Sequence, residues 1–145
     1  MEILFEKEDI KKILPHREPF LFVDAILELK PGLYAKGLKK VEESEFYFQG
    51  HFPKFPVMPG VLIVESIAQV GAVCVLTLEE FKGNVPFFSG IDKCRFKRKV
   101  TPGDTMLIEV ELLRLMKSSR FGKGKGKVFV TNELVAEGEF LFSIS

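Results

Sequence analysis

The sequence predicts an α+β domain: a long central helix wrapped by a bent antiparallel sheet of about five or six strands. Three observations support this. Residues 61–78 form an apolar run of helical length, interrupted by Glu65 and Gln69. The segments after residue 85 are rich in branched and aromatic residues and are bounded by Pro, Gly and Asn. A helix that is apolar nearly all round must be covered on most sides, and a sheet curling around it achieves this.

Periodicity and the positions of proline and glycine predict the elements of the first half. A short amphipathic helix is expected over residues 6–14, where apolar residues share one face. A proline-broken loop follows, and then come strands over 21–29 and 33–41 with a Pro-Gly turn between them. The central helix is expected over about 61–82, because Gly83 next to Asn is typical of a helix stop.

Almost all of the second half has the residue composition typical of β-strands. The expected strands are 85–91, 94–100, 105–117, 125–131 and 133–145. Residues 117–127, KSSRFGKGKGK, are expected to form a loop tip or a solvated strand end. A phosphate-binding glycine loop is disfavoured there because no helix start follows these glycines. The connection Thr131-Asn132 lacks the Asn-Gly pattern typical of a type I′ hairpin turn.

Size, charge and cysteine usage exclude several classes of protein. A chain of 145 residues fits a single domain over 1–145, since domains are typically about 100–150 residues. A net charge of +1 provides no basic field for nucleic acid, and the N-terminus has no signal-peptide pattern. The charged and amide groups in the long apolar run favour a buried helix over a membrane span. Cys74 and Cys94 have no metal-ligand spacing, so we expect reduced, buried thiols in a cytoplasmic protein.

The segment GHFPKFPVMPG, residues 50–60, is the first candidate for chemistry. Pro53, Pro56 and Pro59 restrict the backbone around His51 to a rigid, largely extended path. A neutral imidazole, with an ordinary pKa of about 6.5, can accept a proton near neutral pH. A structural histidine at a loop corner is a comparable interpretation of the local sequence.

The helix that follows adds an acid and a carbonyl site. Glu65 lies in an apolar stretch, where burial raises a carboxyl pKa and suits a general acid. Gln69, four residues later, shares its face and is expected to support it by a hydrogen bond. Gly60 at the helix start presents backbone N–H groups that can hold an oxyanion. These groups suit proton abstraction beside a carbonyl coupled to loss of a hydroxyl, whereas His16 is expected to be a loop or packing residue.

The stretch GHFPKFPVMPGVLIVESIAQ resembles the signature of the β-hydroxyacyl-[acyl-carrier-protein] dehydratases of bacterial type II fatty acid synthesis. LPHREPFLFVD, FFSGIDKCRFKRKVTPGD and LVAEGEFLFSI resemble the family's other blocks, in the same order and over nearly the whole chain. The resemblance implies the hot-dog fold. It also implies homodimers with one continuous sheet, which commonly assemble as trimers of dimers.

The resemblance further implies the reaction and its residues. His51 and Glu65 fall on the catalytic pair, contributed by opposite protomers, and Gly60 falls on the glycine whose N–H binds the thioester carbonyl. His51 would remove the α-proton, while Glu65, or a water it holds, protonates the β-hydroxyl. The (3R)-3-hydroxyacyl chain on acyl carrier protein would become a trans-2-enoyl chain. No metal or organic cofactor is implied, because the acyl chain arrives on phosphopantetheine.

Two further sets of residues are assigned with the help of the resemblance. The acyl chain needs an apolar tunnel, although core packing explains the candidate wall residues about as well. These are Phe87, Phe88, Ile91 and Phe96. Carrier protein is acidic, so a basic rim is expected, although a solvated strand edge is nearly as good an interpretation. The candidates are Arg95, Lys97, Arg98 and Lys99.

Three alternatives remain open at this point. A related dehydratase that also isomerises the double bond has aspartate at the position of Glu65, so glutamate favours dehydration alone. A hot-dog thioesterase would hydrolyse the thioester and does not need the block around His51 in this form. A domain that only binds acyl thioesters would be expected to lack His51 or Glu65, and both are present.

Overall fold

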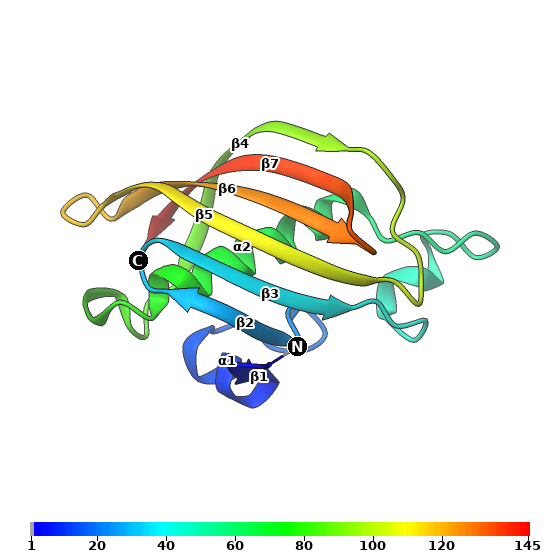
Figure 1. The fold of residues 1–145 in the computed structure, drawn as a ribbon, viewed down its shortest axis with the longest axis horizontal. Coiled ribbons are helices and arrows are strands. Elements are labelled where there is room, and N and C mark those ends of the chain that lie inside the picture. Colours follow the sequence, from blue (N-terminus) through cyan, green and yellow to red (C-terminus); the bar gives the residue numbers. More distant parts are fainter. Residues whose placement is uncertain (1) are drawn as a thin grey trace.

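A computed structural model describes residues 2–145, and all its strands form one seven-stranded sheet that is antiparallel throughout (Figure 1). The elements are β1 (Phe5–Glu6), α1 (Lys7–Ile13), β2 (Ala25–Lys30), β3 (Tyr34–Lys40), α2 (Gly60–Leu76), β4 (Pro86–Phe96), β5 (Thr105–Met116), β6 (Phe121–Val130) and β7 (Glu133–Ile144), with short 3₁₀ helices at Phe46–Gln49 and Glu79–Phe81. The strand order is β1-β2-β3-β5-β6-β7-β4. The α+β class is confirmed, with one strand more than the upper expectation.

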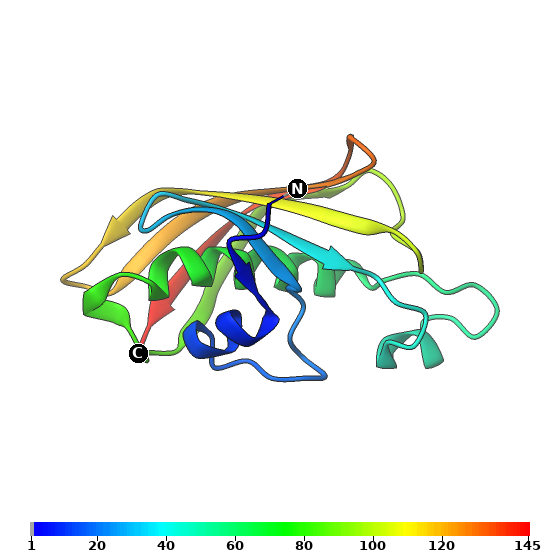
Figure 2. The ribbon, with the colours of Figure 1, turned by 60° about the horizontal axis from the view of Figure 1, so that its bottom comes forward.

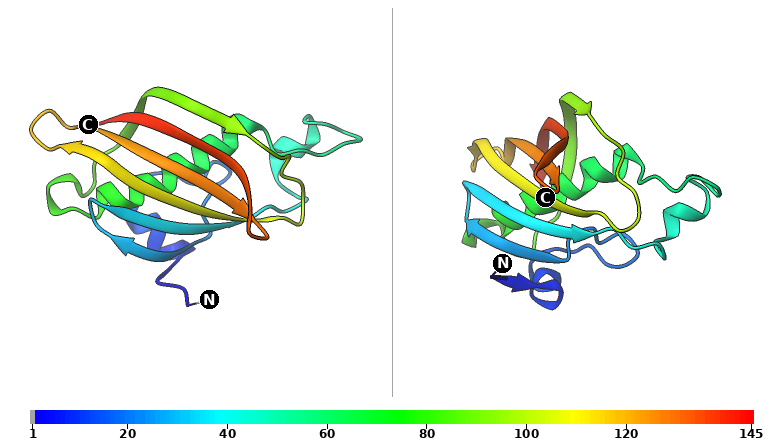
Figure 3. Two further views of the ribbon diagram at one scale, coloured as in Figure 1. Left: turned by 45° about the horizontal axis from the view of Figure 1, so that its top comes forward. Right: turned by 45° about the vertical axis from the view of Figure 1, so that its right-hand side comes forward.

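Helix α2 lies along the inner face of the curved sheet, and α1 lies on the far side of α2 from most of the strands (Figure 2). The same arrangement is visible from two other directions in Figure 3. Residues 69–76 of α2 are all buried, which fits a helix with no wet face over its second half. Side chains of α2 join those of the strands and the N-terminal segment in one hydrophobic core.

A row of glycines in β6 lets the sheet approach this core closely. Gly122, Gly124 and Gly126 point inward and alternate with lysines on the outer face. A Cβ atom at Gly126 would overlap the side chain of Ile67 on α2, and one at Gly124 would lie 2.5 Å from the ring of Phe140. The expected loop is therefore confined to residues 117–120, because the following glycines and lysines belong to a strand with period two.

Helix α2 is shorter than the sequence predicts. It ends at Leu76 rather than near residue 82. The hydroxyl of Thr77 donates to the carbonyl oxygens of Val73 (2.8 Å) and Cys74 (3.2 Å), which satisfies groups at the helix end. Leu78 then adopts an extended conformation, and a separate 3₁₀ turn follows. The glycine stop at residue 83 belongs to that later turn and not to α2.

Two strand connections also differ from expectation. Segments 85–91 and 94–100 merge into the single strand β4, which bends at two register shifts, and residues 97–100 lie outside it. The β6–β7 hairpin closes through Thr131 and Asn132, which both have positive φ (51° and 65°). This matches the backbone of a type I′ turn, although the sequence lacks its usual glycine.

Strand β4 is an edge of the sheet and carries several exposed apolar side chains. Phe87 is 55% exposed, Ile91 49% and Phe96 49%. An edge strand has unpaired backbone groups, and natural proteins usually shield such an edge. In the isolated chain β4 is therefore an uncovered apolar edge.

Two smaller findings concern the membrane and the thiols. No helix in the described part of the chain combines the length and apolar character that crossing a membrane requires. Both cysteines are free; Cys74 is buried as expected, whereas Cys94 is only half-buried because it lies on the edge strand β4.

Gly126→Ala should destabilise the fold by about 1–3 kcal/mol, because the added methyl group overpacks the contact between β6 and Ile67. Urea unfolding at a fixed protein concentration measures the change. Gly50→Ala is the control, since a Cβ there meets nothing within 4 Å. Equal stability of the two variants would show that the glycine row is not needed for close packing.

Candidate active site

His51 is held in one orientation by its own loop. Its backbone N–H donates to the carbonyl of Tyr47 (3.1 Å), and its carbonyl accepts from the N–H of Val57 (3.0 Å). The imidazole Nδ1 lies 2.7 Å from the carbonyl oxygen of Val57. Because a carbonyl oxygen only accepts, Nδ1 must carry the hydrogen of the neutral ring. Nε2 is therefore left with a free lone pair, which is what a general base needs.

Gly60, the first residue of α2, shares a surface hollow with His51. Phe96 at the end of β4 lines the same hollow, and a Cβ at Gly60 would lie 2.9 Å from its ring. Only glycine lets the helix start approach the ring this closely. The first N–H groups of a helix have no intrahelical acceptor and lie at its positive end, so this hollow can attract an anionic oxygen.

Glu65 lies beyond the first turn of α2, and its side chain is 17% exposed. Burial raises the pKa of this carboxyl above its ordinary value, and a hydrogen bond from Gln69 opposes the rise. The amide Nε2 of Gln69 donates to Oε2 of Glu65 at 2.9 Å. A carboxyl group with a raised pKa keeps its proton to higher pH and can act as an acid.

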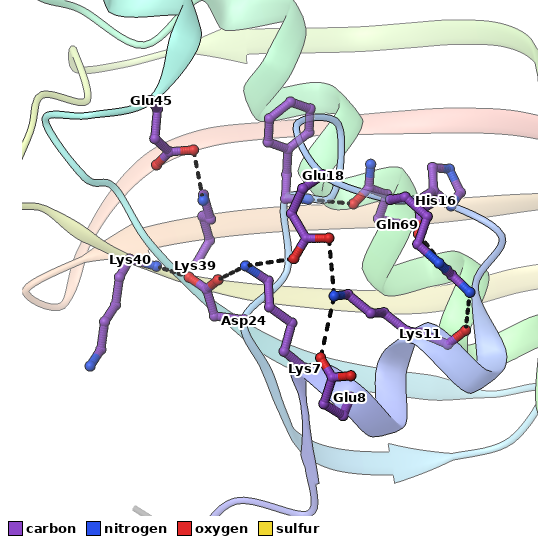
Figure 4. A network of polar contacts seen from close by, with 12 residues as sticks. Lys7, Glu8, Lys11, His16, Glu18, Asp24, Lys39, Lys40, Glu45 and Gln69 are labelled. Carbon is purple, nitrogen blue, oxygen red and sulfur yellow. Dashed lines mark hydrogen bonds and ion pairs between the residues drawn. The ribbon is translucent and has the colours of Figure 1, made fainter.

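Gln69 also ties helix α2 to the loop that follows α1. Its side chain is fully buried; Oε1 accepts from the N–H of Phe22 (2.7 Å) and Nε2 donates to the carbonyl of Phe20 (2.9 Å). Figure 4 shows Gln69 facing this loop, close to His16. The i+4 spacing predicted the contact with Glu65, but the two bonds to distant backbone were not predicted.

His16 lies in the loop, as expected, and its partly buried side chain packs near Glu65 of α2. Its Nε2 lies 3.6 Å from Oε2 of Glu65. Burial lowers the pKa of the imidazole, and neighbouring Arg17 lowers it further. No spacing in the sequence could have indicated this contact, because it depends on how the loop packs against α2.

An apolar pocket with about 450 Å³ of free space, part of it open to solvent, is lined by Glu65 and His16 among other residues. Small residues of α2 form one wall, and aromatic residues of β4 and β7 form the other. The lining residues besides Glu65 and His16 are Ala68, Gly71, Ala72, Val75, Pro86, Phe87, Phe88, Phe140 and Phe142. Such a cavity can hold an apolar chain next to a carboxyl group.

The expected tunnel residues do not all line one cavity in the structure. Phe87 and Phe88 line the Glu65 cavity, whereas Phe96 lines the His51 hollow. Ile91 lies between them on β4, lining neither. Within one chain, His51 and Glu65 thus occupy different hollows, at opposite ends of β4.

The basic residues expected at a rim lie mostly around the His51 hollow. Lys97, Arg98 and Lys99 line it. Lys97 is 3.6 Å from Glu137, and Arg98 is paired with two acidic side chains at 3.5 and 3.7 Å. Arg95 is exposed on β4. These pairs are long and partly exposed, so each contributes little stability and its basic partner can be recruited by another anion.

Sequence comparison places this chain among well-defined relatives. Residues 14–139 match the family described as FabA-like domain. The curated 3-hydroxyacyl-[acyl-carrier-protein] dehydratase FabZ of Caldicellulosiruptor saccharolyticus is 57% identical over 141 residues, covering 97% of this chain and 99% of the relative. The FabZ of Pelotomaculum thermopropionicum is 54% identical with the same coverage, and that of Staphylococcus haemolyticus is 49% identical, covering 99% and 98%.

Solved structures show the same fold at low sequence identity. The dehydratase heterocomplex ApeI:P from Xenorhabdus doucetiae matches with a TM-score of 0.76 and 17% identity, covering 94% of this chain and 90% of that one. An uncharacterized protein from Pyrococcus horikoshii matches with a TM-score of 0.68 and 14% identity, covering 100% and 95%. The expected hot-dog fold is confirmed.

Glu65→Gln should stabilise the fold, and the gain should depend on pH. Burial raises the pKa of Glu65 above that of the unfolded chain, so the stability that the protonated carboxyl contributes is complete below about pH 4.5 and is lost as pH rises through the folded-state pKa. The side-chain amide of the Gln variant does not ionise, so the variant does not lose this stability as the pH rises. Urea unfolding at pH 4 and pH 8 should therefore show a gain only at pH 8. Glu43→Gln at an exposed site is the control, and an identical response of both variants would contradict the prediction.

Proposed function

Because this chain belongs to the FabA-like family of 3-hydroxyacyl-[acyl-carrier-protein] dehydratases, we propose that it dehydrates its substrate with His51 as base and Glu65 as acid. The substrate is a (3R)-3-hydroxyacyl chain on acyl carrier protein, and the product is the trans-2-enoyl chain of fatty acid elongation. This assignment rests on the orientation of His51, which leaves Nε2 with a free lone pair that can accept a proton.

The reaction balances with these groups alone. His51 Nε2 takes the α-proton, and the electron pair of the broken C–H bond forms the enolate of the thioester. The N–H of Gly60 at the start of α2 stabilises the enolate oxygen. As the enolate collapses to the double bond, Glu65 gives its proton to the β-hydroxyl, which leaves as water. No step needs a metal or an organic cofactor, and phosphopantetheine on the carrier delivers the acyl chain.

Glu65 and His51 come together when two copies pair through β4. The strand is an exposed apolar edge, and two copies related by a two-fold axis would pair it antiparallel to itself. Antiparallel pairing brings the Phe96 end of one β4 beside the Phe87 end of the other. The His51 hollow lies at the first end and the Glu65 cavity at the second. The dimer then contains two complete sites; assembly of three dimers is proposed from the family resemblance.

The same arrangement indicates where the acyl chain and the carrier protein bind. The acyl chain enters the cavity beyond Glu65, between α2 and the wall that contains Phe87 and Phe88. Acidic carrier protein binds the basic rim around the His51 hollow, where Lys97, Arg98 and Lys99 lie. One sheet and one core support a single dehydratase domain over residues 1–145. Since the carrier and its acyl chains are cytoplasmic substrates, we place the reaction in the cytoplasm.

His51→Ala and Glu65→Gln should each lower the dehydration rate by about 10²–10⁴-fold, the usual contribution of a general acid or base. Enoyl formation on carrier protein measures the loss, while a free thiol or a cis-3 product would indicate thioesterase or isomerase chemistry instead. Mixing the two inactive variants should restore activity, because a hybrid dimer has one intact site. No recovery despite demonstrated subunit exchange would contradict a site shared between protomers.

Ile91→Lys should convert the dimer to monomers and abolish activity. Ile91 lies near the middle of β4, where the two-fold axis brings each residue close to its own copy, so two like charges would meet there. Light scattering after size exclusion measures the mass. Leu113→Lys is the control, because Leu113 is also an exposed apolar residue (46%) but lies on the interior strand β5. A dimeric, active Ile91→Lys variant would refute pairing through β4.

A further inference from the structure

The two oxygens of the Glu65 carboxylate have different surroundings. Oε2 is faced by two nitrogens, Nε2 of Gln69 at 2.9 Å and Nε2 of His16 at 3.6 Å. Within the described residues, no protein hydrogen bond ends on Oε1. One oxygen is therefore held by the protein, and the other is available to a ligand in the cavity.

We propose that His16 is a positioning residue for Glu65: together with Gln69 it faces Oε2 with an N–H group, which leaves Oε1 to carry the proton to the departing hydroxyl. This inference rests on the proposed function, because it concerns the acid of that reaction. It gives the loop after α1 a part in catalysis beyond packing.

The hydrogen-bonding capacity of the two partners determines the tautomer of His16. The Gln69 amide is bonded to two oxygens and so donates to Oε2, which makes that oxygen an acceptor. With the Glu65 proton on Oε1, as proposed, Oε2 can only accept, so a second group facing it is favourable only as a donor. We therefore place the hydrogen of the neutral imidazole on Nε2. Nδ1, which is buried without a hydrogen-bond partner, is then an empty acceptor, and this is tolerated better than an orphan N–H.

Packing alone does not explain a histidine at this position. A buried imidazole with one unpaired nitrogen is less stable than a satisfied one, and an apolar side chain would fill the same wall without this cost. The other ring nitrogen is the one that faces Glu65. The contact with Glu65 therefore explains why position 16 holds a polar imidazole ring.

The neutral state of His16 matters as much as its position. Burial and Arg17 lower the pKa of the ring, so it remains uncharged at neutral pH. A positive charge at 3.6 Å would instead favour the carboxylate and weaken the acid. His16 and Glu65 are the titratable groups among the cavity-lining side chains of the described chain. Arg17 turns its guanidinium to the carbonyls of Leu14 and Lys11, and the partner protomer's His51 faces Glu65 in the proposed dimer.

An N–H group at Oε2 acts mainly in the transition state. When Glu65 gives up its proton from Oε1, negative charge develops over the carboxylate, and the donors at Oε2 stabilise it. The loop provides a rigid support for this contact, because Gln69 binds its backbone at Phe20 and Phe22. Loss of His16 should therefore reduce kcat and leave KM nearly unchanged.

The test compares His16→Leu, which removes the N–H, with His16→Gln, whose amide can replace Nε2. His16→Leu should reduce kcat by about 10- to 100-fold, because the 3.6 Å approach should tighten to a hydrogen bond in the transition state. A hydrogen bond to a charged group contributes about 1.5–3 kcal/mol. It should also raise the pKa of Glu65, because the lost donor favoured the carboxylate. Titration of the ¹³C-labelled glutamate carboxyl by NMR, assigned with Glu65→Gln, measures that pKa without relying on activity. His16→Gln should restore most of both properties.

The control is Glu18→Gln on the same loop, which should change neither kcat nor the Glu65 titration. If His16→Leu does not fold, His16→Met replaces it as the apolar variant. An unchanged kcat and an unchanged titration in the apolar variant would overturn the inference. The inference would also be overturned if the apolar and Gln variants lose the same amount of kcat while the pKa of Glu65 stays unchanged. A wild-type protein that forms no enoyl product would instead refute the proposed function, while the titration still tests the His16 contact.

Discussion

The buried side-chain amide of Gln69 is the interaction on which the rest of the site depends. It satisfies two backbone groups of the loop after α1 and also donates to Glu65, so one residue links Glu65 to that loop. A buried amide is costly unless all its groups are paired, and here both its oxygen and its nitrogen are bonded. The same bonds bring His16 to Glu65, because they determine how the loop lies against α2.

Close packing between the helix and the sheet forms the apolar cavity next to that acid. The glycines of β6 leave space into which the rings of Phe140 and Phe142 pack from β7. Those rings and small residues of α2 are opposite walls of the cavity at Glu65. A larger residue in the glycine row would push the rings toward the helix. The glycines of β6 thus help to set the size of the apolar cavity at Glu65.

The apolar edge of β4 and the separation of the two hollows have one explanation. An exposed edge with aromatic side chains is an association hazard for a monomer. The proposed pairing with a second copy would cover this edge and, by the antiparallel geometry, would join a His51 hollow to a Glu65 cavity. The same proposed contact would both shield the edge and bring His51 and Glu65 together.

The sequence by itself determined the α+β class, the two helices, most strands and the Gln69–Glu65 contact, because each depends on local periodicity or on neighbouring turns of one helix. The resemblance added the hot-dog fold and the dehydratase family, which the comparisons confirmed; the roles of His51 and Glu65 stay predictions. Only the tertiary structure decided that His16 lies near Glu65, that α2 ends at Leu76 and which hollow each of His51 and Glu65 lines. These features depend on packing between segments distant in sequence, which local patterns do not encode.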